Sequence, residues 1–493
     1  MSCQPSKTRT TINRLPSTPI HLLDDDSLLI IFSFCRPLLF DESKVYDEVH
    51  LLEGGEWNRE WWWYRLMQVC RRWRNLVLQS AFHLQVSLVC ARGTPVADML
   101  AHSPSVPLII DHIDDEYHVL APEDEEGIIF ALQHRNRVRR IRIRKSVSIL
   151  QKLVVALDGE FPILDHLLIV NRRSYRPLID CTTNLNFPET FRAPQLRQLL
   201  IDNFATPIES PPFTTMQNLV TLFLTSIPSS GYFHPNVLLQ QLSLMSRLEI
   251  LAILFNCYNP SHDIERQLLR TPIMTRVTLP NLYWLMFEGT NAYLETLLSW
   301  VSIPLLTRIH IHLFNRMTYS IPYLRQFMGT IGNLRLKTAM FLFRENHLDV
   351  TIYPHKGATL YNLSVELSGR HLDWQVVSAA QVFHALKTVF SAVDDLTLKY
   401  NRHNLLPEWN RQADRTHWCE LFGLFGKVKT LRVEYGLVEQ VSRALQPGDG
   451  ESPMELLPEL EELSYSTRSA SGAFTLFIDS RQKAGRPLTV NHI

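Results

Sequence analysis

Histidines and carboxylates are the side chains of this sequence with the clearest potential for chemistry. His310 and His312 are two residues apart, so on a strand both imidazoles would lie on one face and could hold a metal ion. The sequence identifies no third ligand beside them, so no metal is expected. His112 and His118 flank an acidic stretch that runs through Glu126, and this stretch is typical of a solvated loop.

The motifs of common catalytic and phosphate-binding sites are missing from the sequence. It has no Gly-x-Ser-x-Gly elbow, no Walker loop, no Gly-x-Gly-x-x-Gly after a strand and no His-Glu-x-x-His helix. The basic run from Arg135 to Lys145 alternates with Val138, Ile141 and Ile143 as a strand does. We expect a solvated edge strand there, which an acidic partner could use, and neither a nucleic-acid site nor a cofactor.

The composition indicates a folded chain with several cores or one elongated repeat array. Of its 493 residues, 45% are hydrophobic, and 49 basic residues balance 49 acidic ones. This balance does not favour nucleic acid or an anionic membrane as a partner. Seven scattered cysteines indicate reduced thiols, and the polar amino terminus lacks the apolar segment of a signal peptide. We therefore expect a cytoplasmic or nuclear protein.

One pattern, apolar-x-x-apolar-x-apolar, recurs beyond residue 130. Each copy ends in period-two alternation, which is typical of a short strand with one buried face. Successive copies start 23 to 35 residues apart, a spacing that resembles leucine-rich repeats with irregular outer segments. The copies begin at Val138, Leu164, Leu196, Leu219, Leu248, Leu282, Leu306, Leu336, Leu360, Val393, Val428 and Leu460, of which the copy at Leu336 is the weakest.

Helical spacing fills several of the segments between the copies. It is found at 236–245, 292–301, 323–331 and 379–393. Strand and helix repeated in one sense predict an α/β fold, an irregular leucine-rich-repeat-like solenoid with a curved parallel sheet inside and helices outside. The alternative is a mixed α/β globule in which leucine is merely common.

Period two also assigns the faces of the predicted sheet. If the motif leucines point to the core, the residues between them lie on the concave surface, where repeat proteins usually bind partners. Large apolar side chains there are candidate anchors for a protein target, unless flanking loops or the amino-terminal helices cover them. The candidate target-binding residues are Arg142, Phe223, Trp284, Met286, Arg308, His310 and His312.

The region before residue 90 is predicted to be helical. Asp24, Asp25 and Asp26 precede an apolar cluster and suit a helix start, because carboxylates accept hydrogen bonds from free amides there. Residues 40–56 are acidic and contain two adjacent glycines, which indicates a loop, and residues 57–80 resume helical spacing.

Two ordered stretches of this region resemble an F-box. They are Leu-Leu-Asp-Asp-Asp-Ser-Leu-Leu-Ile-Ile-Phe-Ser-Phe at 22–34 and Leu-Met-Gln-Val-Cys-Arg-Arg-Trp-Arg-Asn-Leu-Val at 66–77. Asp24 stands where the family has proline, and the connection between the stretches is longer than in a typical member. The resemblance implies a helical motif that docks on the Skp-type adaptor of cullin-RING ubiquitin ligases. The adaptor-binding residues it implies are Leu23, Leu28, Ile31, Phe32, Val69, Cys70, Arg72, Trp73 and Leu76.

Four segments follow from these patterns. They are a disordered tail at 1–17, an F-box-like helical domain at 18–90 with an insertion at about 40–60, a leucine-rich-repeat-like solenoid at 91–480 and a tail at 481–493. Together they predict a non-enzymatic substrate receptor of an SCF-type ligase that recruits an unknown protein target. One alternative is a ligase-independent repeat scaffold whose helical head caps the solenoid. Another is an enzyme, for which a cleft with clustered titratable residues, not expected here, would be the sign.

Overall fold

The structure is a computed structural model of the 493-residue chain. It describes residues 19–35, 62–81, 83–84, 86–103, 105–113, 121–171, 184–256, 276–314, 321–331, 336–400, 415–446, 456–466 and 472–492. The predicted tail at 1–17 and insertion at 40–60 lie outside these residues. Among the residues that are described, no helix combines the length and apolar character that crossing a bilayer requires.

The amino-terminal head, residues 19–35 and 62–80, consists of short helices. They are η1 (Pro19–Leu22), α1 (Asp25–Phe34), α4 (Trp62–Met67) and α5 (Arg71–Gln79). The carboxylate of Asp24 caps α1 by accepting a 2.7 Å hydrogen bond from the amide of Ser27. The helical spacing over 57–80 proves to be interrupted, because Cys70 adopts an extended backbone and caps α5. Residues 57–61 lie outside the described part.

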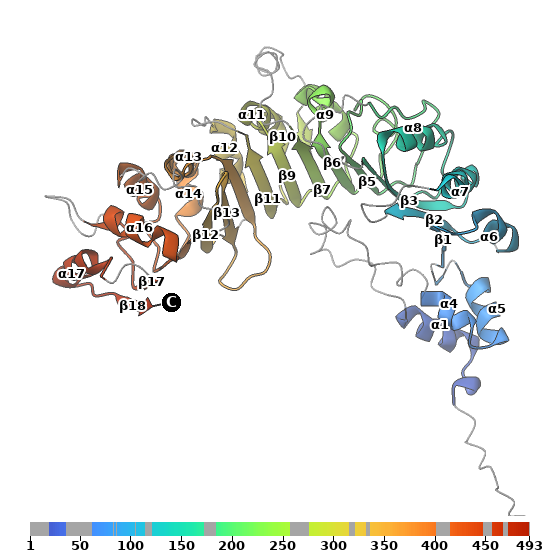
Figure 1. Cartoon of the computed structure of the whole chain (residues 1–493), viewed down its shortest axis with the longest axis horizontal. Helices are drawn as coiled ribbons and strands as arrows, with labels where there is room; N and C mark the ends of the chain where they lie inside the picture. Colours follow the sequence, from blue (N-terminus) through green and yellow to red (C-terminus); the bar gives the residue numbers. More distant parts are fainter. Residues whose placement is uncertain are drawn as a thin grey trace, which may run out of the picture.

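The remainder is built on one sheet of 16 strands, bent into an arch (Figure 1). Its strands in spatial order are β1 (Leu88–Cys90), β2 (Leu108–Ile113), β3 (Val138–Lys145), β4 (His166–Asn171), β5 (Gln198–Asp202), β6 (Thr221–Ile227), β7 (Ile250–Phe255), β9 (Trp284–Gly289), β11 (Arg308–Leu313), β14 (Leu363–Ser368), β13 (His347–Tyr353), β12 (Thr338–Phe343), β15 (Asp395–Tyr400), β16 (Thr430–Val433), β17 (Glu462–Tyr465) and β18 (Thr489–His492). A second sheet pairs β8 (Val277–Thr278) with β10 (Val301–Ser302). Each of the twelve motif copies runs into a strand of the large sheet, as predicted.

Helices line the outer side of the arch (Figure 1). They are α6 (Val96–His102), α7 (Pro122–Gln133), α8 (Val147–Val155), α9 (Pro235–Leu242), α11 (Asn291–Trp300), α12 (Pro322–Thr330), α13 (Leu372–Ala385), α14 (Lys387–Phe390), α15 (Arg415–Phe422), α16 (Val438–Leu445) and α17 (Thr475–Lys483), with the 3-10 turns η3 (Ser229–Gly231) and η5 (Tyr435–Leu437). The predicted helix at 379–393 is two helices, α13 and α14, and α13 begins earlier than its spacing indicated. The predicted solenoid with an inner sheet and outer helices is confirmed.

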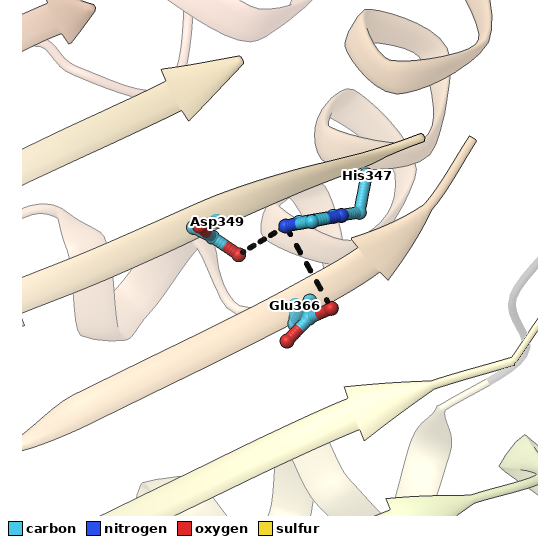
Figure 2. Close-up of side chains that lie close together, drawn as sticks. All are labelled: His347, Asp349 and Glu366. Carbon is cyan, nitrogen blue, oxygen red and sulfur yellow. Dashed lines mark ion pairs between the residues drawn. The ribbon is translucent and has the colours of Figure 1, made fainter. Parts of the chain in front are cut away.

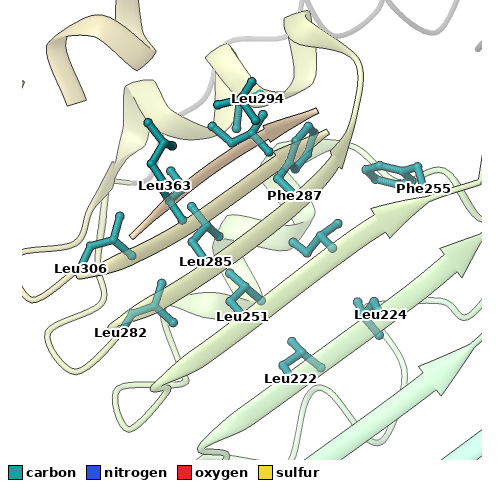
Figure 3. Packing of buried hydrophobic residues seen from close by; sticks show 14 of the residues in the cluster. Leu222, Leu224, Leu251, Phe255, Leu282, Leu285, Phe287, Leu294, Leu306 and Leu363 are labelled. Atoms are coloured by element: carbon teal, nitrogen blue, oxygen red, sulfur yellow. The ribbon is translucent and has the colours of Figure 1, made fainter. Parts of the chain in front are cut away.

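The motif leucines form the core between the sheet and these helices. In the sheet register Leu222 pairs with Leu251, Leu251 with Leu285, Leu285 with Ile309 and Ile309 with Leu363. Most of these side chains stack in Figure 3, and all five are buried. Because every strand contributes the same position, burial in one repeat depends on its two neighbours, which is how a solenoid obtains its stability.

One strand of the large sheet, β13, runs against its neighbours, whereas the sequence predicted one continuous parallel sheet. Strand β13 is antiparallel to both β12 and β14, so the order along the sheet is β11-β14-β13-β12-β15. Only Arg344, Glu345 and Asn346 connect β12 to β13, and a parallel pair needs a crossover of about a dozen residues. The short connection therefore forces a hairpin, and the weak copy at Leu336 lies beside β15 instead of beside β11.

Both ends of the solenoid extend beyond the predicted repeats. The acidic stretch begins in strand β2, where His112 is buried, and its end forms α7, so a solvated loop is wrong for these residues. Residues 114–120 lie outside the described part. Strand β3 lies between β2 and β4 and is therefore not an edge strand. At the other end, Thr489–His492 pair with β17, so they continue the sheet instead of forming a tail.

Candidate interaction surfaces

The head is held together by several of the residues that the F-box resemblance singled out. Leu28, Phe32 and Leu76 are buried, and Phe32 meets the ring of Trp73 edge-on with centroids 4.7 Å apart. Trp73 is itself partly buried. These side chains stabilise the packing of α1 on α5, so Leu28, Phe32 and Leu76 do not lie on a surface that a partner could reach.

Polar residues of the same set also act within the head. Arg72 donates to the carboxylate of Asp25 at 2.7 Å and to the carbonyl oxygen of Leu23 at 2.7 Å, so it ties the start of α5 to the start of α1. The Sγ of Cys70 accepts from the amide of Trp73 at 3.5 Å. Arg72, Cys70 and the partly buried Leu23 therefore position the two helices. Ile31 and Val69 are the predicted apolar residues that are exposed.

Helix α1 has a second apolar face that remains in solvent. Ile30 and Phe34 are one helical turn apart and are 56% and 83% exposed, and Ile31 beside them is 39% exposed. We call Ile30, Ile31 and Phe34 the docking face. The sequence analysis missed Ile30 and Phe34, although five consecutive apolar residues, 28–32, are too many for a helix with a single buried stripe.

The apolar side chains of the concave surface form a second hydrophobic cluster, separate from the main core. It contains Phe223, Trp284 and Met286 together with Leu168 and Ile250. The three candidate anchors lie together in this cluster, but they are only 4%, 1% and 3% exposed. Their expected availability as exposed anchors is wrong for this structure.

Charged side chains cover part of that cluster. The guanidinium of Arg308 lies 4.1 Å from the ring centroid of Trp284 and 4.5 Å from that of Tyr361, a sandwich that adds cation–π attraction to packing. Near the amino-terminal end, Arg142 donates to Asp111 at 3.1 Å. The arginines predicted to meet a target thus also stabilise the concave surface, on which they remain partly exposed.

Beyond Trp284 the concave surface changes from apolar to ionic. Glu288, His312, Glu366 and Asp349 are register partners across β9, β11, β14 and β13, and we call them the charged row. His312 lies 3.1 Å from Glu288 through Nδ1 and 3.4 Å from Glu366 through Nε2. Such a cluster of titratable groups was not expected from the sequence, because Glu366 and Asp349 are far from His312 along the chain.

The two histidines of the His310-x-His312 pair have opposite electrostatic environments. Burial, with the charges of His312 and Arg308 assisting, lowers the pKa of His310 to about 4. Burial also opposes the charge on His312, but its hydrogen bond to Glu288 and the nearby carboxylates outweigh burial and raise its pKa. The two neighbouring imidazoles therefore differ in how readily they take up a proton.

An arch of parallel strands with outer helices and a repeated leucine position defines a solenoid of the leucine-rich-repeat type. Comparison with models of protein families finds no match, and no curated protein matches the sequence. Among solved structures, the TLR13–ssRNA13 complex is similar over 82% of this chain and 49% of its own, with 13% identity and a TM-score of 0.30. The Rad7–Elc1 complex of yeast is similar over 91% of this chain and 90% of its own, with 12% identity and a TM-score of 0.29.

The present chain therefore spans about half the length of the TLR13 chain, 49%, and nearly the full length of the second match. TM-scores this low do not establish a shared fold. The class assigned to this chain rests on its own sheet order, register and burial.

Proposed function

We propose that the chain is an F-box-type substrate receptor of an SCF-type cullin-RING ubiquitin ligase, with its head docked on a Skp-type adaptor. The docking face carries the proposal, because α1 is apolar on both sides and buries only one of them in the head. Removing exposed isoleucine and phenylalanine side chains from water lowers the free energy, and this would stabilise a complex with a partner. The sequence resemblance of residues 22–34 and 66–77 supports the choice of partner.

In this proposal the solenoid recruits a protein target. Because the candidate anchors Phe223, Trp284 and Met286 are buried, recognition falls to the partly exposed polar residues of the concave surface. Arg142, Arg308 and His310 are among them. Holding the target beside a ubiquitin-charged enzyme raises their effective concentration, so the receptor needs no catalytic group of its own. The complex would act in the cytoplasm or the nucleus.

The experiment is a calorimetric titration of the full-length chain with a purified Skp-type adaptor. The double variant Ile30→Ser, Phe34→Ser removes two exposed side chains without entering the core. One interface anchor contributes about 2 kcal/mol, so we expect at least a 30-fold weaker Kd, about tenfold for each 1.4 kcal/mol.

The matched control is Val155→Ser, Leu476→Ser, which changes two exposed apolar residues of α8 and α17. It should bind the adaptor as the wild type does. Equal affinity of the wild type and the Ile30/Phe34 variant would exclude the docking face as the binding site.

A ligase-independent scaffold is the second candidate. The main hydrophobic core continues from Val77 of α5 through Ala81 and Leu84 to Leu88 of β1, as it would if the head were a cap on the solenoid. The same titration separates the two candidates, because a wild-type chain that does not bind the adaptor at micromolar concentration would favour the scaffold.

A further inference from the structure

The antiparallel pairing of β13 with β14 brings Glu366 beside His347 and Asp349, and together these residues offer three possible metal ligands. The atoms that His347, Asp349 and Glu366 can offer all lie within 4.8 Å of one another, and Figure 2 shows the imidazole directed at both carboxylates. The distance from Nε2 of His347 to Oδ1 of Asp349 is 3.5 Å, and to Oε1 of Glu366 it is 3.9 Å. Ligands about 2.1 Å from a tetrahedral zinc ion lie roughly 3.4 Å apart, so small side-chain movements would complete a site.

From this geometry we infer a binding site for a divalent transition metal, with Zn²⁺ as the best-fitting ion, formed by His347, Asp349 and Glu366. The imidazole favours a transition metal over Mg²⁺ or Ca²⁺, which prefer oxygen ligands alone. Three protein ligands fill three of the four positions around a tetrahedral ion, and water occupies the fourth.

The surrounding residues hold these ligands in the manner of known metal sites. Arg344 donates to Oδ2 of Asp349 at 2.6 Å, which leaves Oδ1 for the metal. On the other side, Nε2 of His312 lies 3.4 Å from Oε1 of Glu366, the oxygen that also faces His347. Nδ1 of His312 is held by Glu288 at 3.1 Å. Hydrogen-bonded neighbours of this kind orient ligands and tune their basicity.

Charge and access also fit a cation. Before the histidines are counted, the carboxylates of Glu288, Asp349 and Glu366 outnumber the guanidinium of Arg344, so the local charge is negative. The side chains of the three ligands are between 22% and 30% exposed, so an ion can reach them from the concave surface without unfolding the sheet.

The test is a calorimetric titration of the untagged, chelator-stripped full-length chain with Zn²⁺, and separately with Mg²⁺. We expect one saturable Zn²⁺ site per chain, weakened at least about tenfold by His347→Ala or Glu366→Gln and retained in the control His384→Ala, which changes an exposed histidine of α13. The chain has 19 histidines and seven cysteines, so the difference between variants, and not total zinc, is the readout.

Asp349→Asn, which keeps the size of the side chain, covers the case in which His347→Ala fails to fold, and circular dichroism of each stripped variant checks folding. Added Zn²⁺ should also raise the Tm of the wild type and of His384→Ala but not of Asp349→Asn. Equal Zn²⁺ affinity in the wild type, Glu366→Gln and Asp349→Asn would overturn the inference, as would Mg²⁺ binding as tight as Zn²⁺ binding.

Discussion

In the head, Ile30 and Phe34 of α1 remain in solvent, whereas in the solenoid the large apolar residues Phe223, Trp284 and Met286 of the concave surface are buried. The difference follows from the number of neighbours. A central strand has a strand on each side, so Trp284 packs beside Ile250 and under Arg308. Helix α1 packs on α5 on one side only, and Ile30 and Phe34 on its other side stay exposed. In the head, an exposed apolar face therefore indicates where a partner binds. On the solenoid, partly exposed polar side chains are the better guide to a binding surface.

The largest effect is expected for the core of the solenoid. Phe287 is fully buried, with ring centroids 6.3 Å from Phe255 and 5.8 Å from Tyr293. Phe287→Ala should lower the free energy of unfolding by about 3–5 kcal/mol, through lost burial and a cavity. Chemical denaturation followed by circular dichroism measures it.

The control for this substitution is Leu360→Ala, at an apolar motif position that is 44% exposed, where we expect a loss of about 0.5 kcal/mol or less. Similar losses for the two variants would contradict the claim that motif burial stabilises the array.

A smaller, local effect should distinguish the two faces of α1. Phe32 is buried against Trp73, so Phe32→Ala should destabilise the head by about 3 kcal/mol, seen as faster amide hydrogen exchange in α1 and α5. Phe34→Ala should leave exchange unchanged while weakening adaptor binding. If both variants lost protection equally, Phe34 would belong to the core and the docking face would be misassigned.

The smallest effect concerns His166 on the concave surface. Burial, with the charges of Arg140 and Arg142, lowers its pKa from 6.5 to about 3. Below pH 6.5 this histidine binds a proton in the unfolded chain but stays neutral in the folded chain, which favours unfolding. The folded chain therefore keeps its full stability above pH 6.5, and stability falls as the pH drops toward 3. Because glutamine does not titrate, the loss in the free energy of unfolding between pH 7.5 and pH 5.5 should be smaller by about 1 kcal/mol in His166→Gln than in the wild type.

Denaturation at the two pH values measures this effect, with His384→Gln on the exposed end of α13 as the control. An unchanged pH dependence in His166→Gln would mean that folding does not lower the pKa of His166.

The misses of the sequence analysis have two different causes. Strand β13 alternates Leu348, Val350 and Ile352 with polar residues and could have been found from that pattern. In contrast, the resemblance to an F-box named Phe32 and not Phe34 as adaptor-binding, whereas Phe32 is buried and Phe34 is exposed. A resemblance marks conformity to a family and not the direction of each side chain. The helical periodicity of α1 carries that information only once its packing partner, α5, is known.

The sequence alone determined where the twelve motif strands of the solenoid lie and which face of each enters the core, because alternation is a local property of each strand. Only the tertiary structure decided which strands are neighbours, since pairing depends on connection lengths and on packing over the whole sheet. The three-residue link after Phe343 folds β13 back along β12, and β14 pairs with the other edge of β13. That pairing placed His347 and Asp349 against Glu366, a contact that no spacing along the chain expresses.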